Sequence, residues 1–484
     1  MRVTILGHAG LFVESEATTI LVDPWLFGSC YWRSWWHYPP SPSPADEWLS
    51  PSYLYLSHHH FDHFHYPSLR RIDKSSHVLI PYFGNDVMPE ELARLGFSTI
   101  TEIRHGTPLE LAPGLEVTSF QYGFDDSALV VADHDAVVFD LNDCKIRPAD
   151  LERLRRRFGS PDLMAKSHSW AQGYPNCYSA DNPTDLTLLS RSDYIADFVA
   201  SVRTLRPRYA LPFASMVCFL HPDSWPRNAD VITPPEIADA LAESPVPGTE
   251  VLVLGPGDTW EHRSDGPGAG PATTSVIRRA DVADYYAARH ERLEALRVQA
   301  SPAIDRSLAE EATEVPDVAT VTDYLDRFLH ALPLGIGVVL RRPVLLRIIG
   351  ERACWVLDWR TRRAERVEAP PVTFASCVEL PAAVLARAIR DRILHFVHIS
   401  MRFRTHVREG GISIDFAFWS LLAMWELGYL PLRRLVNRRF VSVAWRRRAE
   451  LLALAGAALG QRGPLAARMA SRFIASEERP ARRS

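Results

Sequence analysis

The chain has 484 residues, of which 47% are apolar and 23% charged, and its formal net charge is −4. This length allows two or three domains with ample core, and the composition is ordinary for a globular protein. The slightly negative charge gives no electrostatic case for a nucleic-acid partner.

Cysteine usage and the N-terminus indicate the compartment. Six scattered cysteines form no CxxC or Cys-x-His pair, which excludes a zinc finger or an iron–sulfur centre within this sequence. Sparse cysteines in a large chain favour a reducing compartment. The N-terminus lacks the pattern of a signal peptide, and Asp415 and Glu426 interrupt the most apolar later stretch. We therefore expect a cytoplasmic protein without integral membrane association.

The first 260 residues alternate short apolar runs with turns and helical periods. Expected strands are 3–6, 11–14, 19–22, 53–56, 115–120, 128–131, 136–141, 209–212 and 251–254, and expected helices are 148–158 and 194–205. This order predicts an α/β fold in which two sheets pack face to face with helices outside. We expect residues 1–261 to form this αββα sandwich.

A stretch rich in Gly, Pro, Ser and Thr follows and predicts a linker over 262–280. Beyond it, 281–300 and 318–331 have helical periods, 337–376 is typical of strands, and 382–396 is an amphipathic helix. Residues 281–484 are therefore expected to form an α+β domain with a helical, Arg-rich end. Its pattern faintly resembles the sterol-carrier fold, and we expect it to support the first domain.

The strongest chemical signal follows the expected strand 53–56. Residues 57–63 read Ser-His-His-His-Phe-Asp-His, so His58, His60, Asp62 and His63 come from one tight loop. Two histidines at i and i+2 on extended backbone point the same way and can hold one metal. The next turn aims Asp62 and His63 at a second site. The motif thus predicts a dinuclear metal centre.

With this motif, residues 1 to about 260 resemble the metallo-β-lactamase superfamily and, within it, the catalytic domain of CMP-N-acetylneuraminate hydroxylase. The segments that carry the likeness are VDPWLFGSCYWRSWW at 22–36, YLSHHHFDHFHYPSLRRI at 55–72, DLNDC at 140–144 and RPRYALPFASMVCFLHPDSW at 206–225. The same fold and motif occur in diiron β-hydroxylases that act on carrier-bound amino acids.

The resemblance implies the remaining ligands. It assigns Asp143 as the carboxylate that bridges the two metals, with Asp140 as its rival, and His221 as the last histidine. Where hydrolases present a third histidine to the first metal, this chain has Gly123-Phe-Asp-Asp-Ser127. We choose Asp126 as the ligand there and keep Asp125 as the alternative.

A site with three carboxylates suits iron better than a histidine-rich zinc site does. The expected function is therefore a non-haem diiron monooxygenase that hydroxylates a C–H bond of a small molecule, in specialised metabolite biosynthesis, with O2 as cosubstrate. The alternative is a dinuclear zinc hydrolase of an ester, lactone or phosphodiester. The hydroxylase family carries a Rieske domain ahead of the catalytic one, whereas this sequence starts with the catalytic fold. We therefore expect electrons from a separate reductase or ferredoxin.

Further residues are expected around the metals. An aromatic loop follows Asp23 and predicts either a substrate wall or a contact between domains or subunits of a homodimer; the residues chosen for the wall are Trp25, Tyr31, Trp32, Trp35 and Trp36. Asp23 is expected to accept a hydrogen bond from the metal loop, and His8 to support a ligand. His168 is expected to bind substrate or relay a proton, with a plain loop residue as the alternative.

Overall fold

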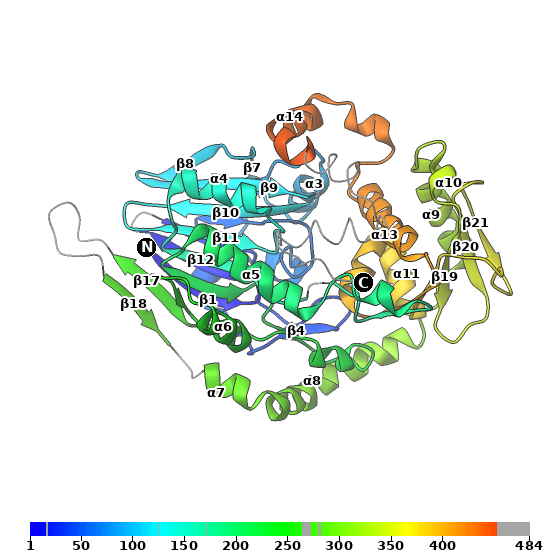
Figure 1. Cartoon of the computed structure of the whole chain (residues 1–484), viewed down its shortest axis with the longest axis horizontal. Helices are drawn as coiled ribbons and strands as arrows, with labels where there is room; N and C mark the ends of the chain where they lie inside the picture. Colours follow the sequence, from blue (N-terminus) through cyan, green and yellow to red (C-terminus); the bar gives the residue numbers. More distant parts are fainter. Residues whose placement is uncertain (16–17, 124, 171, 264–272, 279–281, 453–484) are drawn as a thin grey trace.

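A computed structural model describes residues 1–15, 18–123, 125–170, 172–263, 273–278 and 282–452, and two large sheets organise its first half (Figure 1). The first sheet has the order β18-β17-β1-β2-β3-β5-β6-β7. Its strands are β1 (Arg2–Gly7), β2 (Gly10–Ser15), β3 (Thr18–Val22), β5 (Tyr53–Tyr55), β6 (His77–Pro81), β7 (Ile100–Ile103), β17 (Thr259–Arg263) and β18 (Thr273–Ile277).

The second sheet has the order β16-β14-β12-β11-β10-β9-β8. Its strands are β8 (Pro108–Ala112), β9 (Leu115–Tyr122), β10 (Asp126–Ala132), β11 (Val137–Asn142), β12 (Leu163–Ser167), β14 (Tyr209–Phe213) and β16 (Glu250–Val251). A separate two-stranded antiparallel sheet pairs β4 (Trp35–His37) with β15 (Val217–Phe219).

The core lies between the two sheets because alternate side chains of each strand face the other sheet. Ile5 and Val13 of the first sheet and Val117 and Leu129 of the second belong to one buried cluster. The outer faces carry helices: α1 (Asp46–Leu49), α2 (Tyr66–Leu69) and α3 (Val87–Arg94) on the first sheet, and α4 (Pro148–Phe158), α5 (Arg191–Leu205) and α6 (Pro234–Glu243) on the second. The predicted αββα sandwich is confirmed.

The later half of the chain builds a third sheet, and its helices pack partly on this sheet and partly against the first half. The helices are α7 (Val282–Ala287), α8 (Arg289–Glu311), α9 (Val318–Ala331), α10 (Ile336–Val339), α11 (Ala382–Asp391), α12 (Val397–Ser400), α13 (Ile412–Glu426) and α14 (Arg438–Arg446), with the 3-10 turns η3 (Leu394–Phe396) and η4 (Leu432–Leu435). The strands are β19 (Val344–Ile348), β20 (Cys354–Asp358), β21 (Arg363–Val367), β22 (Ser376–Leu380) and β23 (Arg404–Val407). Among the described residues, no helix has both the length and the apolarity needed to cross a membrane.

The expected linker over 262–280 is corrected in part. Residues 264–272 and 279–281 lie outside the described residues, but Thr273–Ile277 forms β18, which pairs antiparallel with β17 at the edge of the first sheet. No residue of β18 is buried, so this edge strand lacks the apolar alternation by which a strand is predicted from sequence. The first sheet therefore continues to Ile277.

The two halves also share a sheet. Strand β13 (Tyr178–Ala180), from the middle of the first half, pairs in parallel with β23 and completes the order β13-β23-β22-β19-β20-β21. The Tyr178 hydroxyl donates to Asp415 Oδ2 (2.8 Å), and the Ser376 hydroxyl donates to Asp415 Oδ1 (2.7 Å). A boundary at residue 261 therefore does not describe two separable domains, because a strand from one half is hydrogen-bonded into the other.

Replacing Asp415 by asparagine is expected to stabilise the protein above about pH 6 and to have little effect near pH 4. Burial raises the pKa of Asp415 to about 6, although the hydrogen bonds from Ser376 and Tyr178 lower it. The folded state therefore holds a proton that the unfolded state releases, so this residue's contribution to stability falls as pH rises from about 4 to 6. At pH 8 the gain is about 3 kcal/mol, since the pKa rises from 3.8 to about 6 and one pKa unit corresponds to about 1.4 kcal/mol.

Chemical denaturation of wild type and D415N across this pH range measures the effect. The exposed Asp391 supplies a matched control, D391N, which should leave the pH profile unchanged. An unchanged stability difference between pH 4 and pH 8 would contradict an ionised, buried Asp415.

Candidate metal centre

The histidine loop is anchored where two parallel strands end at the same edge. Strands β3 and β5 are paired in parallel, so Asp23 and Ser57, which follow them, lie close together. Asp23 Oδ1 accepts from the Ser57 amide (2.8 Å), and Oδ2 accepts from the Ser57 hydroxyl (2.5 Å) and from His63 Nδ1 (2.8 Å). Asn142 Nδ2 also donates to Oδ2 (2.5 Å). These contacts agree with the expected role of Asp23 as an acceptor that fixes the loop.

Three groups of donor atoms converge beside this loop. His58, His60 and Asp126 form the first group, His58, His63 and Asp143 the second, and His8, Asp62 and His63 the third, with the donor atoms of each group within 4.8 Å of one another. His58 Nε2 and His60 Nδ1 are 2.8 Å apart. Because His58 and His63 each belong to two groups, the three groups form one continuous cluster.

The ring nitrogens that face away from the cluster are held by neighbours, the pattern that fixes metal-ligating histidines. His58 Nδ1 is 2.9 Å from the Ser57 hydroxyl, and His63 Nδ1 contacts Asp23. His60 Nε2 is 3.5 Å from Asp125 Oδ2. Asp125 thus contacts Nε2 of His60, the nitrogen that faces away from the cluster. The other nitrogen, Nδ1, faces His58, and Asp126 belongs to the donor group of these two histidines. This geometry favours Asp126 over Asp125 as the ligand.

Burial and like charge make the metal-free cluster electrostatically costly. Burial, and then the neighbouring charges of Asp125 and Asp143, raise the pKa of Asp126 well above its usual range. Burial and the neighbouring His63 and His60 hold the pKa of His58 well below its usual value. Asp143 Oδ1 is buried without a hydrogen-bond partner, and His63 Nε2 faces the carboxylates of Asp62 (3.5 Å) and Asp143 (3.3 Å). Divalent cations would relieve the repulsion and satisfy these atoms, so the donor set fits metal ions.

Asp143 lies where a bridging ligand would be needed. Its Oδ2 is 3.3 Å from His63 Nε2, and it shares a group with His58, which also belongs to the first group. Burial alone would raise the pKa of Asp143, but the hydrogen bond and charge of His63 hold it below the usual value. Its rival Asp140 lies within β11 and accepts from the Asn142 amide (3.1 Å), so its carboxylate is engaged inside the strand.

The third group contains His8, whereas the sequence assigned its place to His221. His8 Nε2 is 2.8 Å from Asp62 Oδ2, and the Tyr31 hydroxyl donates to Asp62 Oδ1 (2.6 Å). His221 belongs to none of the donor groups found among the described residues, and its Nδ1 faces Asp223 (Oδ2 at 3.5 Å). Burial and the nearby Arg402 lower the pKa of His221 to about 4. On distance, His8 is the better candidate for the third donor.

Paired variants separate these two histidines. H8A is expected to lower the occupancy of the second metal, because a lost ligand or ligand-orienting partner costs about 10- to 100-fold in metal affinity. H221A is expected to leave the occupancy unchanged. Elemental analysis after dialysis at limiting metal measures both, and loss of metal in H221A but not in H8A would restore the assignment made from the sequence.

His168 follows β12 and is buried next to His8. Its Nδ1 is 3.2 Å from the Phe213 carbonyl oxygen, and its Nε2 has no partner. Burial, with a smaller contribution from His8, lowers the pKa of His168 to about 4. It is not among the residues that line the cavity described below.

The aromatic loop lies behind the metal cluster, which corrects the expected substrate wall. None of Trp25, Tyr31, Trp32, Trp35 and Trp36 lines the cavity next to the cluster. Trp25, Tyr31 and Trp35 are buried in the core, and Trp36 packs on a cluster with α8. Sequence alone could not give the side of the cluster on which this loop lies. Its contribution to the site is the Tyr31 hydroxyl on Asp62.

A cavity of about 280 Å³ opens onto the cluster from the other side. The first half contributes His60, Asp62, Asp125, Asp126, Asp143, Lys145, Gln172, Leu189 and Tyr194, and the second half His395, His398, Ile399, Phe416, Trp419, Ser420, Ala423 and Leu427. The carboxylates and His60 thus face a largely apolar wall from α12 and α13. The second half closes the site instead of only supporting the first half. The sequence missed these residues because most of them lie in the apolar stretch that forms α13, which is typical of an ordinary buried helix.

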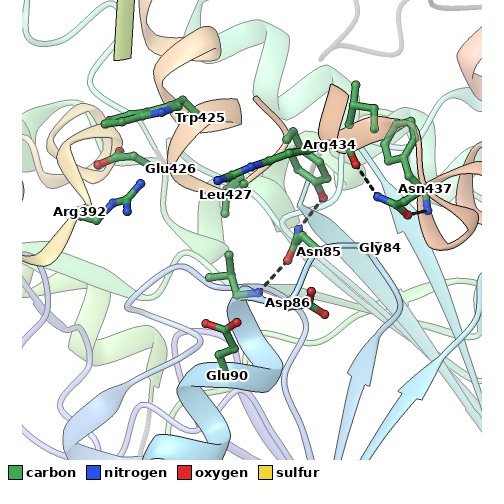
Figure 2. A pocket seen from close by; sticks show the side chains of 15 residues that line it. Gly84, Asn85, Asp86, Glu90, Arg392, Trp425, Glu426, Leu427, Arg434 and Asn437 are labelled. Atoms are coloured by element: carbon green, nitrogen blue, oxygen red, sulfur yellow. Dashed lines mark hydrogen bonds between the residues drawn. The ribbon is translucent and has the colours of Figure 1, made fainter. Parts of the chain in front are cut away.

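A second cavity of about 500 Å³ lies beyond Leu427, between the Gly84–Val87 loop and the end of α13 (Figure 2). Figure 2 shows Arg392, Trp425 and Glu426 at one end and Arg434 and Asn437 at the other. Glu426 therefore lies between the two cavities. The Arg-rich end of the chain packs over this region, where Arg439 pairs with Glu102 (2.6 Å).

Fold and site define a metal-dependent enzyme of the metallo-β-lactamase type, and residues 2–143 match the model of a β-lactamase superfamily domain. A protein of Mycolicibacterium smegmatis named as a putative Rieske 2Fe-2S iron–sulfur protein is 30% identical over 452 residues, which cover 85% of this chain and 83% of that protein. The chain belongs to the family of that protein, within the metallo-β-lactamase superfamily. The predicted superfamily membership is confirmed.

Two further relatives match about half of this chain. A Mycobacterium tuberculosis protein, also named as a putative Rieske 2Fe-2S iron–sulfur protein, is 32% identical over 253 residues, covering 49% of this chain and 48% of that protein. The cytidine monophosphate-N-acetylneuraminic acid hydroxylase of Danio rerio is 24% identical over 236 residues, covering 46% of this chain and 39% of the hydroxylase. The chain therefore spans half or less of the length of these two relatives.

Proposed function

We propose that the protein is a non-haem diiron monooxygenase that hydroxylates a C–H bond of a small molecule. The observation that carries the proposal is Asp126, a carboxylate grouped with His58 and His60. Together with Asp62 and Asp143 it makes the donor set rich in anionic oxygen, which suits iron better than zinc. The similarity to a hydroxylase supports the same reaction class.

Each ligand has a role in the proposal. His58, His60 and Asp126 would hold one iron, Asp62, His63 and His8 the other, and Asp143 would bridge them. Two reduced irons supply activation of O2, which no amino-acid side chain provides. Asp23 and Asp125 orient His63 and His60 through their outer nitrogens, and the Tyr31 hydroxyl orients Asp62.

The cavity indicates the substrate class. Its volume of about 280 Å³ lies at the small end of ligand pockets. Phe416, Trp419 and Ala423 give it an apolar wall that excludes water and positions an unreactive C–H bond. Lys145 forms no ion pair among the described residues. Its Nζ lies over the Tyr194 ring, 5.0 Å from the ring centroid. A substrate with an apolar part and an anionic group therefore fits best.

The reaction needs two electrons from outside the metal centre. The names of two relatives refer to a Rieske iron–sulfur centre, but the present sequence contains no Cys-x-His pair to hold one. We propose that a separate iron–sulfur protein, either a ferredoxin or a reductase, supplies the electrons.

Metal analysis of protein produced with both iron and zinc available tests the proposal. About two irons per chain are expected, with optical absorption that bleaches on reduction and returns with O2. Removal of the metal by a chelator should abolish both signals. Two zincs and no O2-dependent spectrum would contradict the proposal and favour a dinuclear hydrolase acting on an ester, lactone or phosphodiester.

A further inference from the structure

Two residues of the second half form a hydrogen-bonded pair at the substrate cavity. Helix α11 ends at Asp391, and the left-handed backbone of the next residue, Arg392 (φ 56°), turns the chain into η3 and brings His395 to the cavity wall. Glu426 is the last residue of α13 and lies behind His395. Neither residue belongs to the donor groups found among the described residues, so the pair is separate from the metal ligands.

The Glu426 carboxylate holds His395 in one orientation. Its side chain is fully buried and accepts hydrogen bonds from the amides of Leu394 and His395 (both 2.8 Å) and from His395 Nδ1 (2.5 Å). The Tyr324 hydroxyl donates to the same carboxylate. A carboxylate with several donors around it does not rotate freely, so the imidazole that it contacts is fixed as well.

This arrangement sets which nitrogen of His395 faces the cavity. A carboxylate only accepts, so Nδ1 carries the hydrogen and the neutral ring leaves Nε2 as an acceptor. Nε2 is buried and has no partner, although His395 lines the cavity that also contains His60 and Asp125. A buried acceptor without a donor is costly, which favours a ligand that supplies one.

We infer that His395 Nε2 accepts a hydrogen bond from an O–H or N–H group of the substrate and holds the substrate between the metal cluster and α13. The inference rests on the proposed function only in taking this cavity as the substrate site. It adds a third requirement to the substrate class: a hydrogen-bond donor next to the apolar part. The same Glu–His arrangement orients imidazoles in enzymes of unrelated fold.

His398 supplies an internal comparison. It lines the same cavity, but its Nε2 is already hydrogen-bonded to the Tyr178 hydroxyl (3.0 Å). Because the Tyr178 hydroxyl donates to Asp415, His398 Nε2 carries the hydrogen of this bond and offers no lone pair to the cavity. Diethyl pyrocarbonate modifies an imidazole nitrogen that has a free lone pair, so we expect it to react with His395 at Nε2 and with His398 only at Nδ1. Fragment-ion mass spectrometry of the full chain separates the two sites.

The labelling is done on metal-free and Zn²⁺-saturated protein. Zn²⁺ should protect His58, His60 and His63 and leave His395 reactive. E426Q should slow labelling of His395 several-fold, whereas Y324F, which keeps the His395–Glu426 bond, should not. Protection of His395 by Zn²⁺ would make it a metal ligand, and equal rates in wild type and E426Q would remove the role of Glu426; either result overturns the inference.

A pair of small probes tests recognition of a donor. Benzyl alcohol carries an apolar ring and an O–H group, whereas toluene has the ring alone. Benzyl alcohol is expected to protect His395 from labelling several-fold more than toluene does. Equal protection by the two probes would overturn the inference. None of these readouts depends on iron or O2, so a zinc-containing hydrolase would refute the proposed function and leave this result standing.

Discussion

Replacing Asp126 by alanine is expected to remove about one of two metal ions per chain and to abolish turnover, because a ligand of the first site is lost. Asp126 shares a donor group with His58 and His60. Burial and the negative charges of Asp125 and Asp143 raise the pKa of its carboxyl. Removing its carboxylate leaves that metal two histidines and a share of the bridging Asp143, which weakens its binding.

D125A is the matched control, since it deletes the neighbouring carboxylate. Asp125 contacts the outer nitrogen of His60, so this variant should weaken metal binding about 10- to 100-fold and still bind about two metals at saturation. Elemental analysis at limiting and saturating metal measures the difference. Full metal content in D126A together with loss in D125A would reverse the assignment.

Replacing Arg402 by methionine is expected to destabilise the protein by about 3 kcal/mol, because the change leaves buried charge without a partner. The Arg402 side chain is 1% exposed, and its Nη2 lies 2.9 Å from Asp223 and 2.7 Å from Glu311. Its Nη1 also donates to the Trp32 carbonyl oxygen (2.9 Å). One guanidinium thus joins the aromatic loop, the His221 loop and α8.

Denaturant titration of R402M against wild type, at fixed excess metal, measures this loss. R390M is the control, because Arg390 is 62% exposed and pairs with Glu314 at the surface, where an ion pair contributes at most about 1 kcal/mol. Equal stability of R402M and wild type would show that the three segments hold together without this contact.

The choice between Asp125 and Asp126 shows where sequence reasoning ends. Asp125 and Asp126 are adjacent and both line the cavity beside the cluster, so their spacing alone does not tell which one is the ligand. The pairing register decides which one: Asp126 begins β10 opposite Tyr122 of β9, and its side chain joins His58 and His60. The local sequence predicts this hairpin but does not fix at which residue its turn ends and β10 begins.

The second half of the chain was the least predictable part. The expected helix over 382–396 ends at Asp391, and the turn that follows brings His395 to the cavity. Strand β13 crosses into the third sheet, so the two halves fold as one unit around the site. Neither feature has a local signature, because β13 pairs with a strand more than 200 residues away and the His395 turn is held by Glu426 at the end of α13.

The sequence by itself determined the αββα fold and the motif His58, His60, Asp62 and His63, because periodic strands and a loop of closely spaced ligands are local patterns. Tertiary structure decided what surrounds them. It buried the aromatic loop behind the cluster, placed His8 beside Asp62, and closed the cavity with α12 and α13. The physical reason is that a side chain's neighbours across the fold are set by packing between distant segments, which no local spacing encodes.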